Sequence, residues 1–248
     1  WDTIEDEIAA FDPDVIHCGH IWVQASYAAD YGIPLIITAH GTDLIGFEKS
    51  ERFREQAKKA FDAASAVIAI SKDNAALVEK LFGGPEKVHL IQNGYDPTMF
   101  YPEACSVHEV LDHFGIEGDY DSIVSFAGKF TYFKGIDILL NAAALYERDG
   151  VATLLAGDGE LFDEMTALAK SLGLEHVYFL HNQPHEVLRR LYSCATVSLL
   201  TSRNEAFGLV AIEALACGAP VIASNEGGPL DIITPQVGLL FQSENPAD

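Results

Sequence analysis

The sequence predicts an α/β protein made of two Rossmann-like domains, each a doubly wound parallel sheet. The first observation is that short apolar runs rich in β-branched residues recur along the whole chain. They are nearly continuous in apolar character, as is typical of strands that helices cover on both faces. The second observation is that amphipathic stretches of helical length lie between most of these runs. Such alternation indicates a parallel sheet with right-handed crossover connections.

The first half of the chain contains four predicted strands, at residues 15–18, 35–38, 66–70 and 88–91. Helices are expected at residues 22–31, 50–63 and 72–82. Ser71 stands directly before the third of these helices. Because a serine hydroxyl accepts a hydrogen bond from the N–H groups of a first turn, Ser71 is predicted to be the N-cap.

The second half contains six predicted strands, at residues 123–127, 152–156, 177–180, 196–200, 221–224 and 237–241. The helices between them are expected at residues 135–148, 159–172, 185–193 and 208–217. Six strands make a full Rossmann-type sheet. The second half therefore reads as a nearly complete domain.

A turn-rich stretch at residues 94–105, with Pro97 and Pro102, separates the two sets of strands. We expect domains at residues 1–103, linker included, and at residues 104–248. At roughly 30 residues per βαβ unit, the first domain lacks about 60–90 residues of a full Rossmann half. The chain begins with Trp1 and ends soon after its last predicted strand, so we expect it to be part of a longer protein.

The composition excludes several classes of protein. Of the 248 residues 49% are hydrophobic, which is too many for an intrinsically disordered chain. The formal net charge of −22 argues against nucleic-acid binding and against docking on an anionic membrane. This charge indicates a solvated acidic surface, or alternatively a protein from a high-salt cytoplasm. Residues 104–248 hold 20 acidic but only seven basic residues, so the positions of those cations are informative.

The four cysteines are widely separated and form no CxxC pair: Cys18, Cys105, Cys194 and Cys217. They are expected to be free thiols or small buried side chains in a reducing compartment, with no metal site among them. A basic segment followed by an apolar signal-peptide core is absent from the sequence. We therefore expect a cytoplasmic protein.

Two lysines flank a short loop after the first strand of the second half. Lys129 follows Gly128, and Lys134 precedes Gly135, where a helix is expected to begin. Ligands of parallel α/β sheets bind at the carboxyl ends of the strands, and helix N-termini favour phosphate. The loop is thus a candidate phosphate site, although it could also be a loop with two exposed lysines.

Two carboxylates, Glu205 and Glu213, lie around the start of the helix at 208–217, with seven residues between them. Glu205 is expected beside the first helical amides, while Glu213 lies further along the helix in an apolar setting. Carboxylates accept hydrogen bonds from the vicinal hydroxyls of sugars. Alternatively, Glu205 only interacts with the helix dipole and Glu213 is a solvated helix residue. Glu213 has apolar neighbours in sequence, however, and a carboxylate without a partner in such a setting costs stability.

Three further features are weaker. Glycine-rich turns occur at residues 225–231 and 156–160, and each could be a plain turn. His40 follows a strand in the first half and is expected at the sheet edge that faces the second domain. A lone histidine at a strand end is usually structural, but this position favours a functional role. A GxGxxG fingerprint after the first strand and a P-loop are both absent.

Taken in order, these motifs resemble the retaining GT-B glycosyltransferases, specifically the large family 4 with its E-x7-E signature. The resemblance covers essentially the whole chain. It is carried by HGTD at residues 40–43, IQNGYDPTMFYP at 91–102, AGKFTYFKGIDILL at 127–140, AGDGE at 156–160, NEAFGLVAIEALACGAPVIAS at 204–224 and GGPLDII at 227–233.

The resemblance implies that the second domain binds a sugar nucleotide, that the first, partial domain binds the acceptor, and that reaction occurs between them. Lys129 and Lys134 would clamp the diphosphate, Glu205 would contact the donor sugar, and Glu213 would bind the ribose hydroxyls. His40 would act on the donor sugar from the first domain. The predicted catalytic residues are His40, Lys129, Lys134 and Glu205, and the predicted substrate-binding residues are Gly128, Phe207, Gly208, Leu209 and Glu213.

The implied reaction is hexosyl transfer to an acceptor hydroxyl with retention of the anomeric configuration. No metal or other cofactor is expected, because two lysines and a helix dipole can stabilise the leaving diphosphate. The family's glycine-rich loop near the start of the first domain, which closes on the donor phosphates, is absent from these 248 residues.

The alternatives are a non-catalytic sugar-nucleotide-binding module or fragment on the same fold, and a phosphorylase or epimerase. The expected partners are a sugar nucleotide and an acceptor whose identity stays open, as does the oligomeric state.

Overall fold

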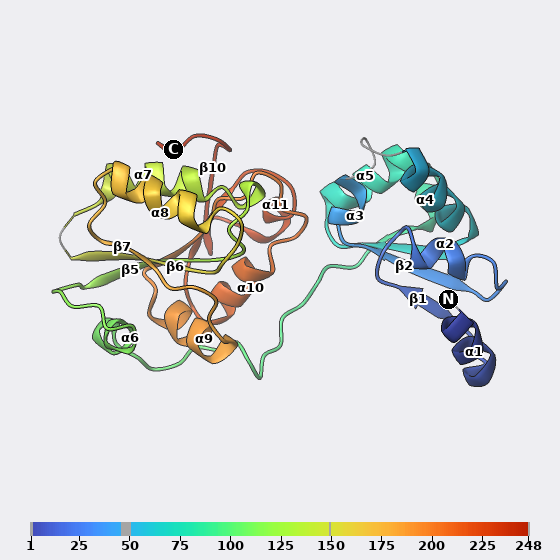
Figure 1. Ribbon diagram of the computed structural model, residues 1–248, viewed down its shortest axis with the longest axis horizontal. Coiled ribbons are helices and arrows are strands. Elements are labelled where there is room, and N and C mark those ends of the chain that lie inside the picture. Colours follow the sequence, from blue (N-terminus) through green and yellow to red (C-terminus); the bar gives the residue numbers. More distant parts are fainter. Residues whose placement is uncertain (1, 46–50, 149, 248) are drawn as a thin grey trace. The chain divides into compact units, whose positions relative to one another are not determined.

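The computed structural model describes residues 2–45, 51–148 and 150–247. The chain divides into two compact units, Trp1–Gln92 and Asn93–Asp248. Each unit is built on a sheet whose paired strands are all parallel, with helices between the strands (Figure 1). The α/β class and the two parallel-sheet units predicted from the strand–helix alternation are confirmed.

Unit 1 holds a four-stranded sheet in the order β1-β2-β3-β4. The strands are β1 (Ile16–Cys18), β2 (Leu35–Ala39), β3 (Ala66–Ala69) and β4 (Val88–Leu90). The helices are α1 (Asp2–Phe11), α2 (Gln24–Ala28), α3 (Thr42–Ile45), α4 (Glu51–Ala63) and α5 (Lys72–Phe82). Helix α5 begins as predicted, because the hydroxyl of Ser71 accepts a hydrogen bond from the Asn74 N–H at 3.1 Å.

Unit 2 holds a six-stranded sheet in the order β10-β9-β8-β5-β6-β7. Counted from β5 as the first strand, this is the Rossmann order 3-2-1-4-5-6. The strands are β5 (Ser122–Ala127), β6 (Val151–Ala156), β7 (Val177–Phe179), β8 (Val197–Leu200), β9 (Val221–Ser224) and β10 (Gly238–Phe241). The helices are α6 (Val107–His113), α7 (Ile136–Tyr146), α8 (Phe162–Ser171), α9 (His185–Cys194), α10 (Leu209–Ala216) and α11 (Pro229–Ile232).

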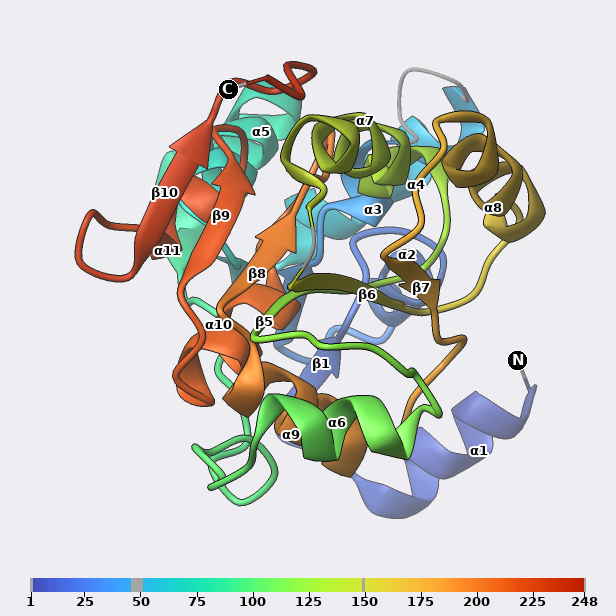
Figure 2. The same cartoon turned by 90° about the vertical axis from the view of Figure 1, so that its left-hand side faces the viewer.

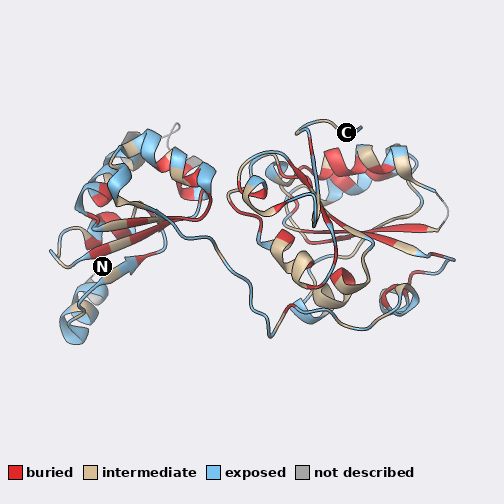
Figure 3. Cartoon of the chain, turned by 180° about the vertical axis from the view of Figure 1, so that it is seen from behind, coloured by how far each residue is buried: buried red, intermediate tan, exposed pale blue. Residues whose placement is uncertain are grey.

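Helices cover both faces of the unit 2 sheet. Helices α7 and α8 lie on one face, and α6, α9 and α10 lie on the other (Figures 1 and 2). The apolar side chains accordingly form two buried clusters, one around Phe126 and Leu139 and one around Ile123 and Leu191. Figure 3 shows the result, with the strands largely buried and the outer sides of the helices exposed. Burial on both faces explains why the strands read as continuous apolar runs.

All ten predicted strands are present, with ends that differ by a few residues. The predicted helices are present too, except that residue 50 of the stretch 50–63 lies outside the described residues. Among the described residues, the α-helices α1, α3, α6 and α11 were not predicted. Helix α6 could have been predicted from the sequence, because Ser106 and Glu109 have the spacing of a capping box and form one. Within the described residues, no helix combines the length and the apolar character that crossing a bilayer requires.

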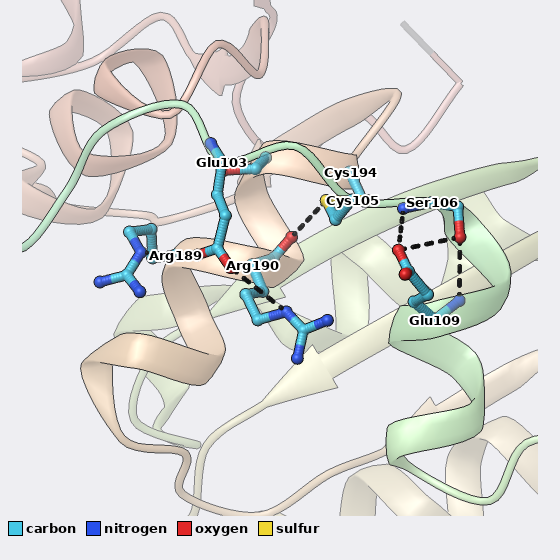
Figure 4. Close-up of a disulfide and its surroundings, with 8 residues drawn as sticks. Glu103, Cys105, Ser106, Glu109, Arg189, Arg190 and Cys194 are labelled. Atoms are coloured by element: carbon cyan, nitrogen blue, oxygen red, sulfur yellow. Dashed lines mark hydrogen bonds and ion pairs between the residues drawn. A yellow bond between two sulfur atoms is a disulfide. The ribbon is translucent and has the colours of Figure 1, made fainter.

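The prediction that all four cysteines are free or simply buried is wrong for two of them. Cys105 and Cys194 form a disulfide across 89 residues of sequence (Figure 4). The pair was missed because the fold, not a local spacing, brings the start of α6 beside the end of α9. Cys18 and Cys217 are buried and free.

The disulfide is one of several bonds that tie the linker to α9. Arg189 donates a hydrogen bond to Glu103 at 2.9 Å, and its guanidinium lies 4.5 Å from the centre of the Tyr101 ring. The Glu103 N–H donates to the Ser193 hydroxyl at 3.0 Å. Figure 4 shows Glu103, Arg189 and Arg190 beside the disulfide. The end of the linker thus packs against α9, within the unit that begins at Asn93.

Candidate functional site

The candidate site lies at the carboxyl edge of the unit 2 sheet, between β5 and β8. From β5 the sheet continues to β6 and β7 on one side, and the chain then returns to β8 on the other side of β5. This reversal is a topological switch point, where the loops after neighbouring strands diverge and leave a crevice that binds ligands. We call residues 128–135, after β5, the lysine loop, and residues 201–208, after β8, the glutamate loop.

The lysine loop leaves the sheet at Gly128, whose N–H donates to the Ala156 carbonyl at 3.0 Å. Lys129 is exposed, and its ammonium has no hydrogen-bond or ion-pair partner among the described residues. Lys134 ends a short 3₁₀ turn, and Gly135 follows with φ 61°. A Cβ on Gly135 would collide with the Thr201 carbonyl, so only glycine allows the two loops to lie this close.

The two loops meet through an ion pair. The Lys134 ammonium donates to Oε2 of Glu205 at 2.6 Å, and the Ser202 hydroxyl donates to the same oxygen at 3.0 Å. The side chains of Lys134 and Glu205 are 29% and 13% exposed, so the pair is partly shielded from water. The buried Ser224 hydroxyl donates to the Ser202 carbonyl at 2.7 Å, which fixes the loop to the end of β9. Two predicted site residues thus lie in contact.

Two helices start at this edge without a side-chain cap. Gly135 is at the N-cap position of α7 and Gly208 at that of α10, and neither glycine has a side chain to cap the first-turn amides. Ser71 caps α5 and Ser106 caps α6, whereas α2, α8, α9 and α11 also lack a side-chain cap. The first N–H groups of a helix have no partner within it and carry partial positive charge, so the amides of α7 and α10 suit an anion.

The chain around the start of α10 is closely packed. Phe207 is buried, whereas Leu209 is 47% exposed. Gly228 lies against the Phe207 backbone, where a Cβ would collide, and its N–H donates to the Glu205 carbonyl at 2.7 Å. The glycine-rich turn at 225–231 therefore supports the glutamate loop. Only glycine at position 228 permits this contact.

Glu213 lies in the middle of α10 and is half-buried. Burial raises the pKa of its carboxyl group, while the nearby His185 at the start of α9 opposes that shift. Its carboxylate has no hydrogen-bond or ion-pair partner in the part of the chain that the structure describes. A half-buried carboxylate without a partner costs stability, and a ligand with hydroxyl donors would satisfy it.

His40 belongs to unit 1, where it follows β2 and is exposed. Its N–H donates to one oxygen of the buried Asp43 at 3.0 Å, and the Ile21 N–H donates to the other at 3.0 Å. Asp43 thus ties the loop after β2 to the loop after β1. This bridge holds the His40 backbone at the carboxyl edge of the unit 1 sheet.

Sequence reasoning missed Arg203, Asp137 and Ser202, which hold the two loops together. Arg203 and Asp137 form an ion pair at 2.6 Å. Nothing in the local spacing pairs residues so far apart, although Arg203 is one of only seven cations in residues 104–248. Across residues 2–45, 51–148 and 150–247, no three His, Cys, Asp or Glu side chains gather into a metal-binding group.

The two Rossmann-like parallel-sheet units are the architecture of GT-B glycosyltransferases, which are the structural neighbours of this chain. The chain belongs to the glycosyl transferases group 1 family, whose model matches residues 114–248. A second model, described as Glycosyltransferase Family 4, matches residues 2–99. The matched ranges cover most of both units.

Two relatives illustrate the similarity. The D-inositol 3-phosphate glycosyltransferase 1 of Catenulispora acidiphila is 34% identical over 262 residues, which cover 95% of this chain and 62% of that protein. An uncharacterized glycosyltransferase of Methanocaldococcus jannaschii is 31% identical over 251 residues, covering 94% of this chain and 63% of that protein.

Two solved structures share the fold. The Anabaena protein HepE in complex with UDP and glucose has a TM-score of 0.83 at 25% identity, with 96% of this chain and 66% of that chain covered. Sucrose-phosphate synthase from Thermosynechococcus elongatus has a TM-score of 0.83 at 27% identity, with 99% and 64% covered. The chain spans less than two thirds of the length of each of these four proteins.

Proposed function

We propose that the chain is part of a retaining hexosyltransferase that moves a sugar from a nucleoside-diphosphate sugar to an acceptor hydroxyl. In this proposal unit 2 holds the donor, and unit 1 forms part of the acceptor side. One observation carries the proposal: Lys134 and Glu205 meet at 2.6 Å at the switch point of the sheet, beside two helix N-termini without side-chain caps.

In this proposal the donor diphosphate binds Lys129, Lys134 and the first amides of α10. Lys129 has no partner among the described residues, and Lys134 exchanges the Glu205 carboxylate for a phosphate oxygen when the donor binds. Solved neighbours that bind UDP and UDP-glucose make uridine nucleotides the first donors to try. The main-chain groups of Gly128, Phe207, Gly208 and Leu209 approach the phosphates and the sugar.

In this proposal Glu205 and Glu213 bind different parts of the donor. Once Lys134 has turned to the diphosphate, Glu205 accepts hydrogen bonds from hydroxyls of the transferred sugar. Glu213, whose carboxylate has no partner among the described residues, accepts hydrogen bonds from the two ribose hydroxyls. His40 contacts the donor sugar from the acceptor side.

Catalysis in this proposal is electrostatic. As the bond to the sugar breaks, negative charge grows on the diphosphate and positive charge on the sugar ring. Lys129, Lys134 and the α10 amides stabilise the diphosphate, which allows transfer without a metal ion. The leaving phosphate takes the acceptor proton on the same face of the sugar, so the anomeric configuration is retained. Glu205 is not a covalent nucleophile.

The proposal is tested by thermal unfolding of this chain with UDP, GDP and ADP at millimolar concentration. We expect one of them to raise the melting temperature, and we expect Lys134→Ala and Glu213→Ala to reduce the rise. No rise with any of the three would reject the proposal. With UDP-glucose and a pool of acceptors, proton NMR of the product should show the anomeric configuration of the donor.

A non-catalytic module on the same fold is the alternative. The exposed Lys129, which has no partner in the part of the chain that the structure describes, fits simple nucleotide binding as well. It predicts the same melting shift but no release of free nucleoside diphosphate from any sugar nucleotide. Release that disappears in Lys134→Ala would favour the enzyme. Addition of EDTA should leave both the shift and the release unchanged.

A further inference from the structure

Arg203 lies in the glutamate loop, two residues before Glu205, and its side chain is only 10% exposed. All five of its guanidinium N–H groups have acceptors. Nη1 and Nη2 form a two-pronged pair with Asp137 at 2.8 and 2.6 Å. Nε and Nη2 bind Glu244 at 2.5 and 3.1 Å, and Nη1 also donates to the Tyr132 carbonyl at 2.8 Å.

Arg203 also contacts the lysine loop through its backbone N–H and through the planar face of its guanidinium group. Its own N–H donates to the Phe133 carbonyl at 2.8 Å. Its guanidinium lies 4.3 Å from the centre of the Tyr132 ring. The contacts with Tyr132 and Phe133 fall on the two residues directly before Lys134. A planar guanidinium can form a forked pair and stack on a ring at once, which a lysine cannot do.

Asp137, one of the two carboxylate partners of Arg203, lies at the N-terminus of a helix. Asp137 is in the first turn of α7, directly after the lysine loop. The hydrogen bonds from Arg203 hold the pKa of the Asp137 carboxyl group below its usual range, so this group stays ionised. An unpaired carboxylate there would cancel the positive end of the helix and repel an approaching diphosphate.

We propose that Arg203 is a positioning residue for the donor diphosphate, which holds the lysine loop against the glutamate loop and neutralises Asp137. This inference rests on the proposed function. Arg203 does not touch the donor. It fixes the position of Lys134, and it neutralises the Asp137 carboxylate, which would otherwise repel the diphosphate.

The test is calorimetric titration of this chain with UDP, at a temperature well below the unfolding of every variant. We expect Arg203→Met to weaken UDP binding about tenfold and Arg203→Lys about threefold, since lysine restores the charge without the fork. Arg189→Met is the matched control, because Arg189 also pairs with a carboxylate and stacks on a tyrosine, but binds the linker. It should change UDP affinity less than twofold.

A second substitution separates positioning from mere stability. Arg203→Met leaves both Asp137 and Glu244 without their arginine. In this background, Asp137→Asn removes the charge that lies in the first turn of α7, and we expect it to restore UDP affinity about threefold at low salt. A purely structural role predicts no recovery. Arg203→Met binding UDP within twofold of the wild type, or no recovery in the double variant, would overturn the inference while the proposed function stands. If the wild type binds no nucleoside diphosphate, the proposed function fails and the inference with it.

Discussion

The Nζ atom of Lys134 lies 2.6 Å from Oε2 of Glu205, although 71 residues of sequence separate them. The pair joins the loops that follow β5 and β8, the two strands at the switch point of the sheet. Partial burial makes its attraction stronger than that of an exposed surface pair. Any anionic ligand of Lys134 must compete with Glu205. The pair therefore controls how tightly this lysine can hold a phosphate.

Replacing Glu205 by glutamine should separate binding from transfer. In Glu205→Gln the ammonium of Lys134 has no charged competitor, so we expect UDP to bind about threefold more tightly. Release of UDP from a sugar nucleotide should fall, because a donor-sugar contact is weakened. Titration calorimetry measures the first effect and a coupled UDP assay the second.

The matched control is Glu164→Gln, which removes the same charge from an exposed position on α8. It should change neither quantity. If Glu205→Gln instead weakened UDP binding tenfold, the competition between Glu205 and the diphosphate for Lys134 would be ruled out.

Glu213 should make the protein less stable at neutral pH than a glutamine in its place. Burial raises its pKa in the folded chain, so folding favours the protonated form. That stabilisation is complete below the ordinary pKa of glutamate and is lost as the pH rises through the raised value. Glu213→Gln should therefore melt at a higher temperature than the wild type at pH 7, with a difference that shrinks toward pH 4.

The same substitution should weaken UDP binding, because an amide is a poorer acceptor for the ribose hydroxyls than a carboxylate. UDP affinity of the wild type should also fall as Glu213 takes up a proton, and this loss should be absent in Glu213→Gln. Melting curves and titrations over a pH series measure both effects. A stability difference independent of pH would show that burial of the charge is not the cause.

Much of the fold was predictable because its strands are buried on both faces. Such strands read as continuous apolar runs, and each of the ten runs became a strand. The missed helices have other causes. Helices α3 and α11 have four residues each, too few to show a helical period. Helix α1 is mostly exposed along the residues whose side chains are described, so its sequence shows only a weak helical pattern of apolar residues.

The candidate site was predictable only in part. Apart from Glu213, which lies within α10, the residues that the resemblance named lie beside strand ends and helix starts, where position along the chain already suggests a role. The residues that hold them, Arg203 with Asp137 and Ser202 with Ser224, pair across loops far apart in sequence. The disulfide of Cys105 and Cys194 was missed for the same reason. Contacts of this kind depend on the strand order, which the sequence does not display.

Gly135→Ala should disturb the junction of the two loops. The residue has φ 61°, and a Cβ would collide with the Thr201 carbonyl. Gly173→Ala is the matched control, since Gly173 also has a positive φ, 74°, but has nothing within 4 Å of its Cβ position. We expect Gly135→Ala to lose at least about 2 kcal/mol more unfolding free energy than the control.

Gly135→Ala should also weaken UDP binding about tenfold, whereas Gly173→Ala should leave it unchanged. Urea unfolding and titration calorimetry provide the two measurements. Equal effects of the two substitutions on unfolding would mean that the close approach of the loops is not needed for stability.

The disulfide should contribute strongly to stability, because it closes a loop across 89 residues. Loop-closure entropy predicts a loss of about 4–5 kcal/mol of unfolding free energy for a bridge of this span. The double variant Cys105→Ser, Cys194→Ser should therefore unfold at lower urea concentration than the oxidised wild type. A reductant should lower the stability of the wild type and leave the double variant unaffected. Identical unfolding of the wild type with and without reductant would contradict the bridge.

Titration of the wild type, Lys134→Ala, Lys129→Ala and Lys170→Ala with UDP, GDP and ADP tests the diphosphate site most directly. Lys170 is an exposed lysine on α8 and controls for net charge. Loss of a charged hydrogen bond should weaken the best ligand about 10- to 100-fold in Lys134→Ala and less in Lys129→Ala, with Lys170→Ala unchanged. Equal affinity in Lys134→Ala and the wild type, or no binding of any of the three nucleotides, would contradict a diphosphate site between β5 and β8.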